Sequence, residues 1–134
     1  MMKIDDIIEA IAFDLRGKGY DAKLTSDSVF LGRGQRNIQI GKIIVRILDG
    51  KFNISSGVGI LFNDIDISDP KSVDLLYLAI EYCTKINNHL EYARDDNVSN
   101  KERVKRGTYS LEIEAGLLRE YYLKRMEIHN ERSN

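Results

Sequence analysis

The stretch from Lys42 to Ser55, KIIVRILDGKFNIS, decides the fold because it pivots on Asp49-Gly50. A two-residue Asp-Gly loop between apolar strands favours a type I′ turn, whose twist matches that of the flanking strands. This turn sets Leu48 opposite Lys51, and the register of every other cross-strand pair then follows. The sequence therefore predicts a β-hairpin whose two faces can be assigned residue by residue.

The two predicted faces of the hairpin differ in chemistry. The first is apolar throughout and is expected to lie in the core: Ile43, Val45, Ile47, Phe52 and Ile54. The second mixes apolar groups with cations and an amide: Ile44, Arg46, Leu48, Lys51, Asn53 and Ser55. Either the second face is open and binds a ligand, or a helix covers Ile44 and Leu48.

Charge is unevenly distributed along the 134 residues, whose net charge is −1. Residues 17–54 carry seven cations and three acids, a local net charge of +4. The neighbouring segments 1–16 and 55–93 carry an excess of acids. A local basic patch attracts phosphate groups even when the whole protein is nearly neutral.

Length and composition predict one compact domain, because 134 residues with 43% hydrophobic side chains are enough for a single core. Cys83 is the only cysteine, which excludes an internal disulfide, and its apolar helical context predicts a buried thiol. The N-terminus lacks a signal-peptide pattern, and no segment approaches the roughly 20 apolar residues of a membrane span. We therefore expect a soluble, cytoplasmic protein.

Apolar periodicity predicts an α+β fold with an N-terminal helix, a four-stranded antiparallel sheet, a long helix and a C-terminal helix. The first helix is expected to end near Gly17, and Ser68-Asp69-Pro70 predicts the start of a helix that runs to about Tyr92. Connections too short for crossover helices require antiparallel strands. The extended segments are expected at 20–25, 28–33, 36–48 and 51–56. Residues 60–67 form either an edge strand or an apolar loop.

These elements divide into a compact domain over 1–93, a polar connector over 94–107 and a C-terminal helix over 108–134. Within the connector, Ser99 and Glu102 predict the cap of a short basic turn that ends at Gly107. The basic residues of this turn, Lys101, Arg103, Lys105 and Arg106, either extend a nucleic-acid track or are simply solvated.

The C-terminal helix carries two apolar stripes that lie about 125° apart at 100° per residue. The first stripe consists of Leu111, Ala115, Leu118 and Tyr122, and the second of Ile113, Leu117, Tyr121 and Ile128. One packing surface covers both stripes only with difficulty. We therefore expect one stripe to face the domain and the other to join a second copy, with Leu111, Leu118 and Tyr122 as the dimerisation residues. The alternative is a terminal helix wedged into a groove of its own monomer.

The candidate nucleic-acid-binding residues gather around the second face of the hairpin: Phe30, Arg33, Arg36, Lys42, Arg46, Lys51 and Asn53, with Lys23 beside them. Proteins that hold single strands combine a cationic groove with aromatic or apolar platforms for the bases. The run Gly32–Arg36 lacks a Walker lysine and does not open a helix, which argues against a nucleotide-hydrolysing phosphate loop. It is either a phosphate-contacting loop or a solvated hairpin tip.

The remaining polar residues do not predict an enzyme, a metal site or a cofactor. Asp64, Asp66 and Asp69 lack the glycine and the terminal glutamate of a calcium loop, so strand-end and helix-cap roles are favoured. His89 and His129 lie in different helices without a metal-ligand or nucleophile partner at helical spacing. We expect a non-catalytic protein.

The order of elements resembles the non-OB single-stranded-DNA-binding proteins of crenarchaea and their viruses, the ThermoDBP-like group. Local likenesses are the opening helix Ile4–Ile8, the helix entry Ile67–Pro70, and Asp74–Leu76 with Ile80–Tyr82 in the helix that follows. The resemblance implies strand binding on the sheet and a C-terminal segment that helps dimerise. It points to Arg46, Lys51, Asn53, Arg33, Arg36 and Phe30 as the strand-binding residues.

The leading prediction is a non-catalytic single-stranded nucleic-acid-binding protein, with DNA favoured, that is dimeric through its last helix. The alternative is a protein-protein interaction module, such as a viral inhibitor or a regulatory adaptor. It would use the same sheet face or the last helix to hold another protein.

Overall fold

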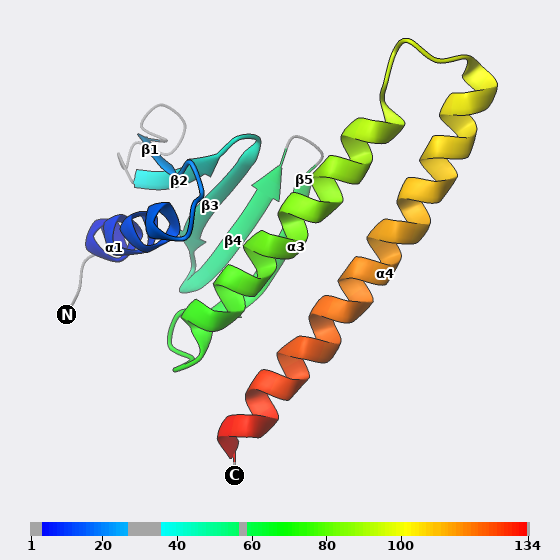
Figure 1. The fold of residues 1–134 in the computed structure, drawn as a ribbon. Coiled ribbons are helices and arrows are strands. Elements are labelled where there is room, and N and C mark those ends of the chain that lie inside the picture. The colour runs from blue at the N-terminus through cyan, green and yellow to red at the C-terminus, as the bar shows by residue number, and fades with distance from the viewer. Residues whose placement is uncertain (1–3, 27–35, 57–58, 134) are drawn as a thin grey trace. The chain divides into compact units, whose positions relative to one another are not determined.

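The computed structural model describes residues 4–26, 36–56 and 59–133 (Figure 1). Over these residues the fold is α+β, with three helices and a five-stranded antiparallel sheet. The chain divides into two compact units, Met1–Asp69 and Pro70–Asn134. The first unit holds one helix and the sheet, and the second holds two helices.

The sheet is a meander in which each strand pairs antiparallel with its neighbours in sequence. Its strands are β1 (Lys23–Ser26), β2 (Arg36–Ile40), β3 (Ile43–Leu48), β4 (Lys51–Ser56) and β5 (Gly59–Asp66). Strand β5 pairs with β4, which confirms the interpretation of residues 60–67 as an edge strand. The extended segment predicted at 28–33 lies outside the described residues.

The prediction of one strand over residues 36–48 is wrong, and the sheet has five strands rather than four. Ile40 pairs with Ile43, so Gly41 and Lys42 form a two-residue turn between β2 and β3. Gly41 has a φ of 59°, and a positive φ at the first central position alone is the pattern of a type II′ turn. The apolar alternation continues across this turn in the sequence, which is why the pattern conceals it.

The hairpin predicted at Asp49-Gly50 is confirmed. Asp49 and Gly50 have φ values of 52° and 75°, and two positive values are what a type I′ turn requires. Leu48 pairs with Lys51, as the predicted register demands. The side chains of the first face are all buried: Ile43, Val45, Ile47, Phe52 and Ile54.

Helix α1 (Ile4–Gly17) contacts β1 and β2. Its buried side chains repeat at three- and four-residue spacing, as an amphipathic helix requires: Ile8, Ile11, Ala12 and Leu15. The helix is closed by the N–H of Tyr20, which donates to the Leu15 carbonyl at 3.0 Å, with Gly19 at a φ of 96°. A left-handed glycine is the common way to end a helix, because it carries no Cβ to clash.

The second unit is an antiparallel pair of helices, α3 (Ser72–Ala93) and α4 (Asn100–Ser133), which lie side by side (Figure 1). Three contacts tie the pair along its length. At one end, Nζ of Lys71 donates to the His129 carbonyl at 2.7 Å. In the middle, the rings of Tyr82 and Tyr121 meet edge to face with centroids 6.0 Å apart. Towards the connector, Oγ of Ser110 donates to the carbonyl of His89 at 2.7 Å.

Both predicted helix starts are corrected. α3 begins at Ser72, and the flanking Lys71 makes no side-chain cap. The hydroxyl and N–H of Ser68 both donate to Oδ1 of Asp66, at 2.7 and 2.9 Å, in the turn that precedes the helix.

α4 begins at Asn100, so the predicted basic turn forms its first two turns and the connector is shorter than residues 94–107. The predicted cap is confirmed, because the N–H of Glu102 donates to Oγ of Ser99 at 3.3 Å. The helix then continues through Gly107, at a propensity cost of about 1 kcal/mol relative to alanine. An ion pair between Arg106 and Glu102, one turn apart at 3.3 Å, offsets part of that cost.

Cys83 is buried in α3, and burial raises the pKa of its thiol from 9.0 to about 12. At pH 8 the thiolate is then about 1,000-fold rarer than in a free cysteine, and the thiolate is the reactive form. We expect a disulfide reagent to label the folded protein at least about 1,000-fold more slowly than the urea-unfolded chain. Equal labelling rates would contradict the burial. Because the folded pKa is the higher one, the thiol's contribution to stability is complete below pH 9 and is lost as pH rises towards 12.

Candidate functional site

The candidate site is the outer face of the sheet, meaning the side chains that point away from the buried first face of the hairpin. Strand pairing assigns its members: Lys23 and Thr25 on β1, Asn37 and Gln39 on β2, Ile44, Arg46 and Leu48 on β3, and Lys51, Asn53 and Ser55 on β4. The second face predicted for the hairpin is thus part of a larger surface that spans at least four strands.

The cations of the outer face follow a diagonal. Lys23 lies on β1 at the end of the sheet near Gly41, Arg46 lies midway along β3, and Lys51 lies on β4 beside the Asp49-Gly50 turn. With strands about 4.8 Å apart and side chains on one face about 6.8 Å apart along a strand, the backbone separations are about 12 Å and about 8 Å. The three cations therefore define a track about 20 Å long.

Arg46 sits in a row of neutral polar side chains that crosses the strands. It pairs with Asn53, and its Nη1 donates to Oγ of Ser55 at 3.4 Å. On the other side of Arg46, β2 pairs Ile38 with Val45, so the next position along the two strands brings Asn37 opposite Arg46. Asn37 is 1% exposed, and neither its amide nitrogen nor its amide oxygen has a hydrogen-bond partner among the described residues.

Acidic residues reduce the positive charge of this face. Lys51 pairs with Asp66 on β5, and the Asp66 carboxylate also accepts hydrogen bonds from Ser68. The pKa of Asp66 is lowered, chiefly by the backbone N–H of Ser68, then by the Ser68 hydroxyl and by the charge of Lys51. Nζ of Lys23 lies 3.8 Å from the carboxylate of Asp21. The outer face is therefore of mixed sign rather than uniformly cationic.

The other predicted binding residues do not all join this face. Arg36 shares the opposite face with Ile38, where it forms an ion pair with Glu9 of α1, and its N–H donates to Asp5 at 3.1 Å. Lys42 lies in the β2–β3 turn, at the far end of β3 from Lys51. Phe30 and Arg33 lie outside the described residues.

Two residues of this surface were missed by sequence reasoning. A continuous strand over residues 36–48 places Asn37 with the odd-numbered residues that face the core. The strand-end role predicted for Asp66 does not place it beside Lys51. The Gly41-Lys42 pair could have revealed the position of Asn37, because glycine at the first position of a two-residue loop is typical of a hairpin turn. A turn there places Asn37 on the outer face.

The predicted dimerisation residues lie along α4. Leu111 is 63% exposed, Tyr122 is also exposed, and Leu118 is half-buried. The second predicted stripe faces α3, because Tyr121 is fully buried against Tyr82. On a helical wheel the first stripe extends to Val104 and Met126, both more than 60% exposed.

We name as the α4 stripe the residues Val104, Leu111, Ala115, Leu118, Tyr122 and Met126, which fall within about 80° of the helix circumference. They extend over more than six turns. An apolar stripe of this length on a helix is much more than the scattered exposed residues of an ordinary surface.

Comparison of the chain with protein-family models, with curated proteins and with solved structures gives no match. Within the described ranges, no group of three or more His, Cys, Asp or Glu side chains is placed to hold a metal ion. The helices that the structure describes include none long and apolar enough to cross a membrane.

Proposed function

We propose that this protein is a non-catalytic single-stranded nucleic-acid-binding protein, with DNA as the favoured strand, that acts as a homodimer joined through α4. The observation that carries the proposal is the diagonal of Lys23, Arg46 and Lys51 on the outer face. A strand laid along it meets a cation near each end and one in the middle, with Ile44 and Leu48 beside them as apolar supports for bases.

The number of cations sets the expected salt dependence of strand binding. Neutralising one phosphate of a single strand contributes about −0.7 to the slope of log affinity against log salt concentration. Three cations therefore predict a slope of about −2. The described part of the outer face carries no aromatic side chain, and Asp66 competes for Lys51, so we expect micromolar rather than nanomolar binding.

The test is fluorescence anisotropy with a labelled oligodeoxythymidylate, titrated at several salt concentrations. Replacing Arg46 by alanine should reduce the slope by about 0.7 and weaken binding, because one phosphate contact is lost. The matched control is Arg36→Ala, since Arg36 lies on the opposite face with Glu9 and should leave the slope unchanged. A parallel titration with oligouridylate compares DNA with RNA.

Two outcomes would remove this proposal. One is the absence of salt-dependent binding at micromolar protein. The other is an equal loss for Arg36→Ala and Arg46→Ala, which would mean that the strand does not follow the outer face.

A second candidate function is supported by the α4 stripe. A protein-protein interaction module would use these exposed apolar residues to hold a different protein rather than a second copy. Two measurements distinguish the candidate functions. The interaction module predicts a monomer in solution that does not bind single strands, and a stoichiometric complex with its protein partner.

A further inference from the structure

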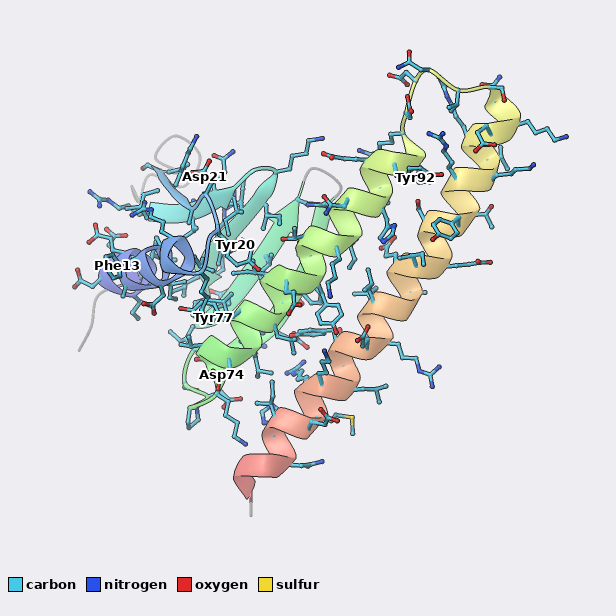
Figure 2. The ribbon with its side chains drawn as sticks, viewed as in Figure 1. Phe13, Tyr20, Asp21, Asp74, Tyr77 and Tyr92 are labelled. Atoms are coloured by element: carbon cyan, nitrogen blue, oxygen red, sulfur yellow. The ribbon has the colours of Figure 1, made fainter. Side chains whose placement is uncertain are left out.

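A second surface with binding chemistry lies in the helical unit, at the end of α3 that leads to the connector. A groove of about 490 Å³ is lined by Asn88, His89 and Tyr92 of α3 and by Tyr109 of α4. Figure 2 shows Tyr92 near the connector end of α3. Small-molecule sites usually have volumes of about 300–1,000 Å³ and apolar walls with a few polar groups.

The rings in this groove are arranged around Tyr109. Its centroid lies 6.3 Å from that of His89, at an interplanar angle of 69°, and 6.5 Å from that of Tyr92, at 71°. In an edge-to-face contact the edge of one ring lies against the face of the other, so each contact covers only one ring face. Tyr92 and Tyr109 are 48% and 52% exposed, so aromatic surface remains open to a ligand.

The groove has a fixed frame. Ser110, which is 1% exposed, donates to the His89 carbonyl at 2.7 Å and sets the spacing of the helices at this level. The Arg106 guanidinium lies 4.6 Å from the Tyr92 ring centroid and forms ion pairs with Asp95 at 3.1 Å and with Glu102. The pKa of Asp95 is lowered, first by the N–H of Asn97 and then by Arg106, so the carboxylate that anchors Arg106 stays charged. Binding here requires little reorganisation.

The chemistry of the lining selects the class of ligand. None of the described lining residues is acidic, and the Arg106 guanidinium already lies over the Tyr92 ring, so the groove does not suit a cationic ligand. A planar ring can stack on Tyr109 or His89, and the Asn88 amide offers a donor and an acceptor to its edge. Stacking of a base on an aromatic side chain is worth about 1–3 kcal/mol.

We propose that this groove binds a nucleobase, either in a free nucleotide or at an unpaired position of a strand. The site is formed wholly by α3 and α4 and does not depend on the outer face of the sheet. It therefore adds a base-reading position to a protein whose sheet is proposed to contact phosphates.

The experiment is fluorine NMR on protein labelled with 3-fluorotyrosine, because each of the seven tyrosines then reports separately. Tyr→Phe substitutions assign the signals of Tyr92 and Tyr109. Titration with adenosine monophosphate should move these two signals saturably, while that of Tyr20 stays in place. Ribose 5-phosphate, which has no base, should move neither.

Tyr109→Ala and His89→Ala should each raise the dissociation constant reported by the Tyr92 signal at least about fivefold, as expected for the loss of one stacking surface. The matched control is Leu123→Ala, which truncates an exposed side chain of α4 outside the groove and should leave the titration unchanged. His89→Ala keeps the test decisive if Tyr109→Ala fails to fold.

The proposal is overturned if adenosine monophosphate at about 5 mM produces no shift, since even millimolar affinity would fill the site at that concentration. It is also overturned if ribose 5-phosphate acts equally, or if all tyrosine signals move together. An oligodeoxyadenylate that moves the same two signals at lower concentration identifies a strand as the source of the base. The double variant Arg46→Ala/Lys51→Ala should retain the mononucleotide response, which separates this site from the outer face.

Discussion

A chain with glutamate in place of both Leu111 and Tyr122 is expected to be a monomer of 15.4 kDa at concentrations where the proposed dimer of the unchanged protein has twice that mass. Both side chains are exposed on the α4 stripe. Burying an apolar side chain of this size is worth about 1.5–3 kcal/mol. Two losses therefore raise the dissociation constant at least about 100-fold, before the cost of burying the new charges is counted.

Light scattering coupled to size-exclusion chromatography measures the mass directly, and far-ultraviolet circular dichroism shows whether both helices remain. The control is Lys105→Glu, which adds the same charge at an exposed position beside the stripe and should leave the mass unchanged. An unchanged protein that is monomeric at about 100 μM would reject the dimer and favour a different partner for the stripe.

Replacing Tyr121 by alanine is expected to lower the free energy of unfolding of the helical unit by about 3–5 kcal/mol. Tyr121 is fully buried, and its ring meets that of Tyr82 edge to face at 6.0 Å. Alanine would leave a cavity between α3 and α4 and remove an aromatic pair that contributes about 0.5–1.5 kcal/mol beyond its buried area. Urea unfolding followed by circular dichroism should show a midpoint lowered by about 1 M or more.

The control for this change lies two residues further along the helix. Leu123 is exposed, and Leu123→Ala should cost less than about 0.5 kcal/mol. Similar losses for Tyr121→Ala and Leu123→Ala would mean that Tyr121 is not the anchor of the helical pair.

The features that the sequence predicted correctly are those determined by neighbouring residues. The Asp49-Gly50 turn fixed the register of β3 and β4 because a type I′ turn leaves one pairing. The end of α1 at Gly17 also follows from the local sequence. Similarly, the two stripes of α4 correctly separated Tyr121, which faces α3, from the exposed Leu111.

The misplacement of Arg36 has a simple physical cause. In one continuous strand Arg36 and Arg46 would share a face, because side chains alternate with a period of two. The two-residue turn at Gly41-Lys42 pairs Ile40 with Ile43, and even-numbered residues of β2 then share a face with odd-numbered residues of β3. One unrecognised turn therefore moved Arg36 to the face of Ile38 and brought Asn37 beside Arg46.

Other parts of the candidate sites depend on partners far apart in sequence. The proximity of Asp66 to Lys51 requires β5 to pair with β4, and the aromatic groove requires α4 to return along α3 until Tyr109 reaches His89. The spacing of residues within one helix or strand contains no information about either of these contacts. The mixed charge of the outer face and the groove between the helices were therefore beyond sequence reasoning.

The meander order of the sheet bears on how the chain acquires its structure. Every strand pairs with the one that precedes or follows it, so each new pair closes a short loop and loses little chain entropy. Local pairing of this kind favours rapid folding. The two hairpins joined by Gly41-Lys42 and Asp49-Gly50 are complete within the first 56 residues. On the ribosome they can therefore form while the second unit is still being synthesised, and the outer face can exist before α4 has been made.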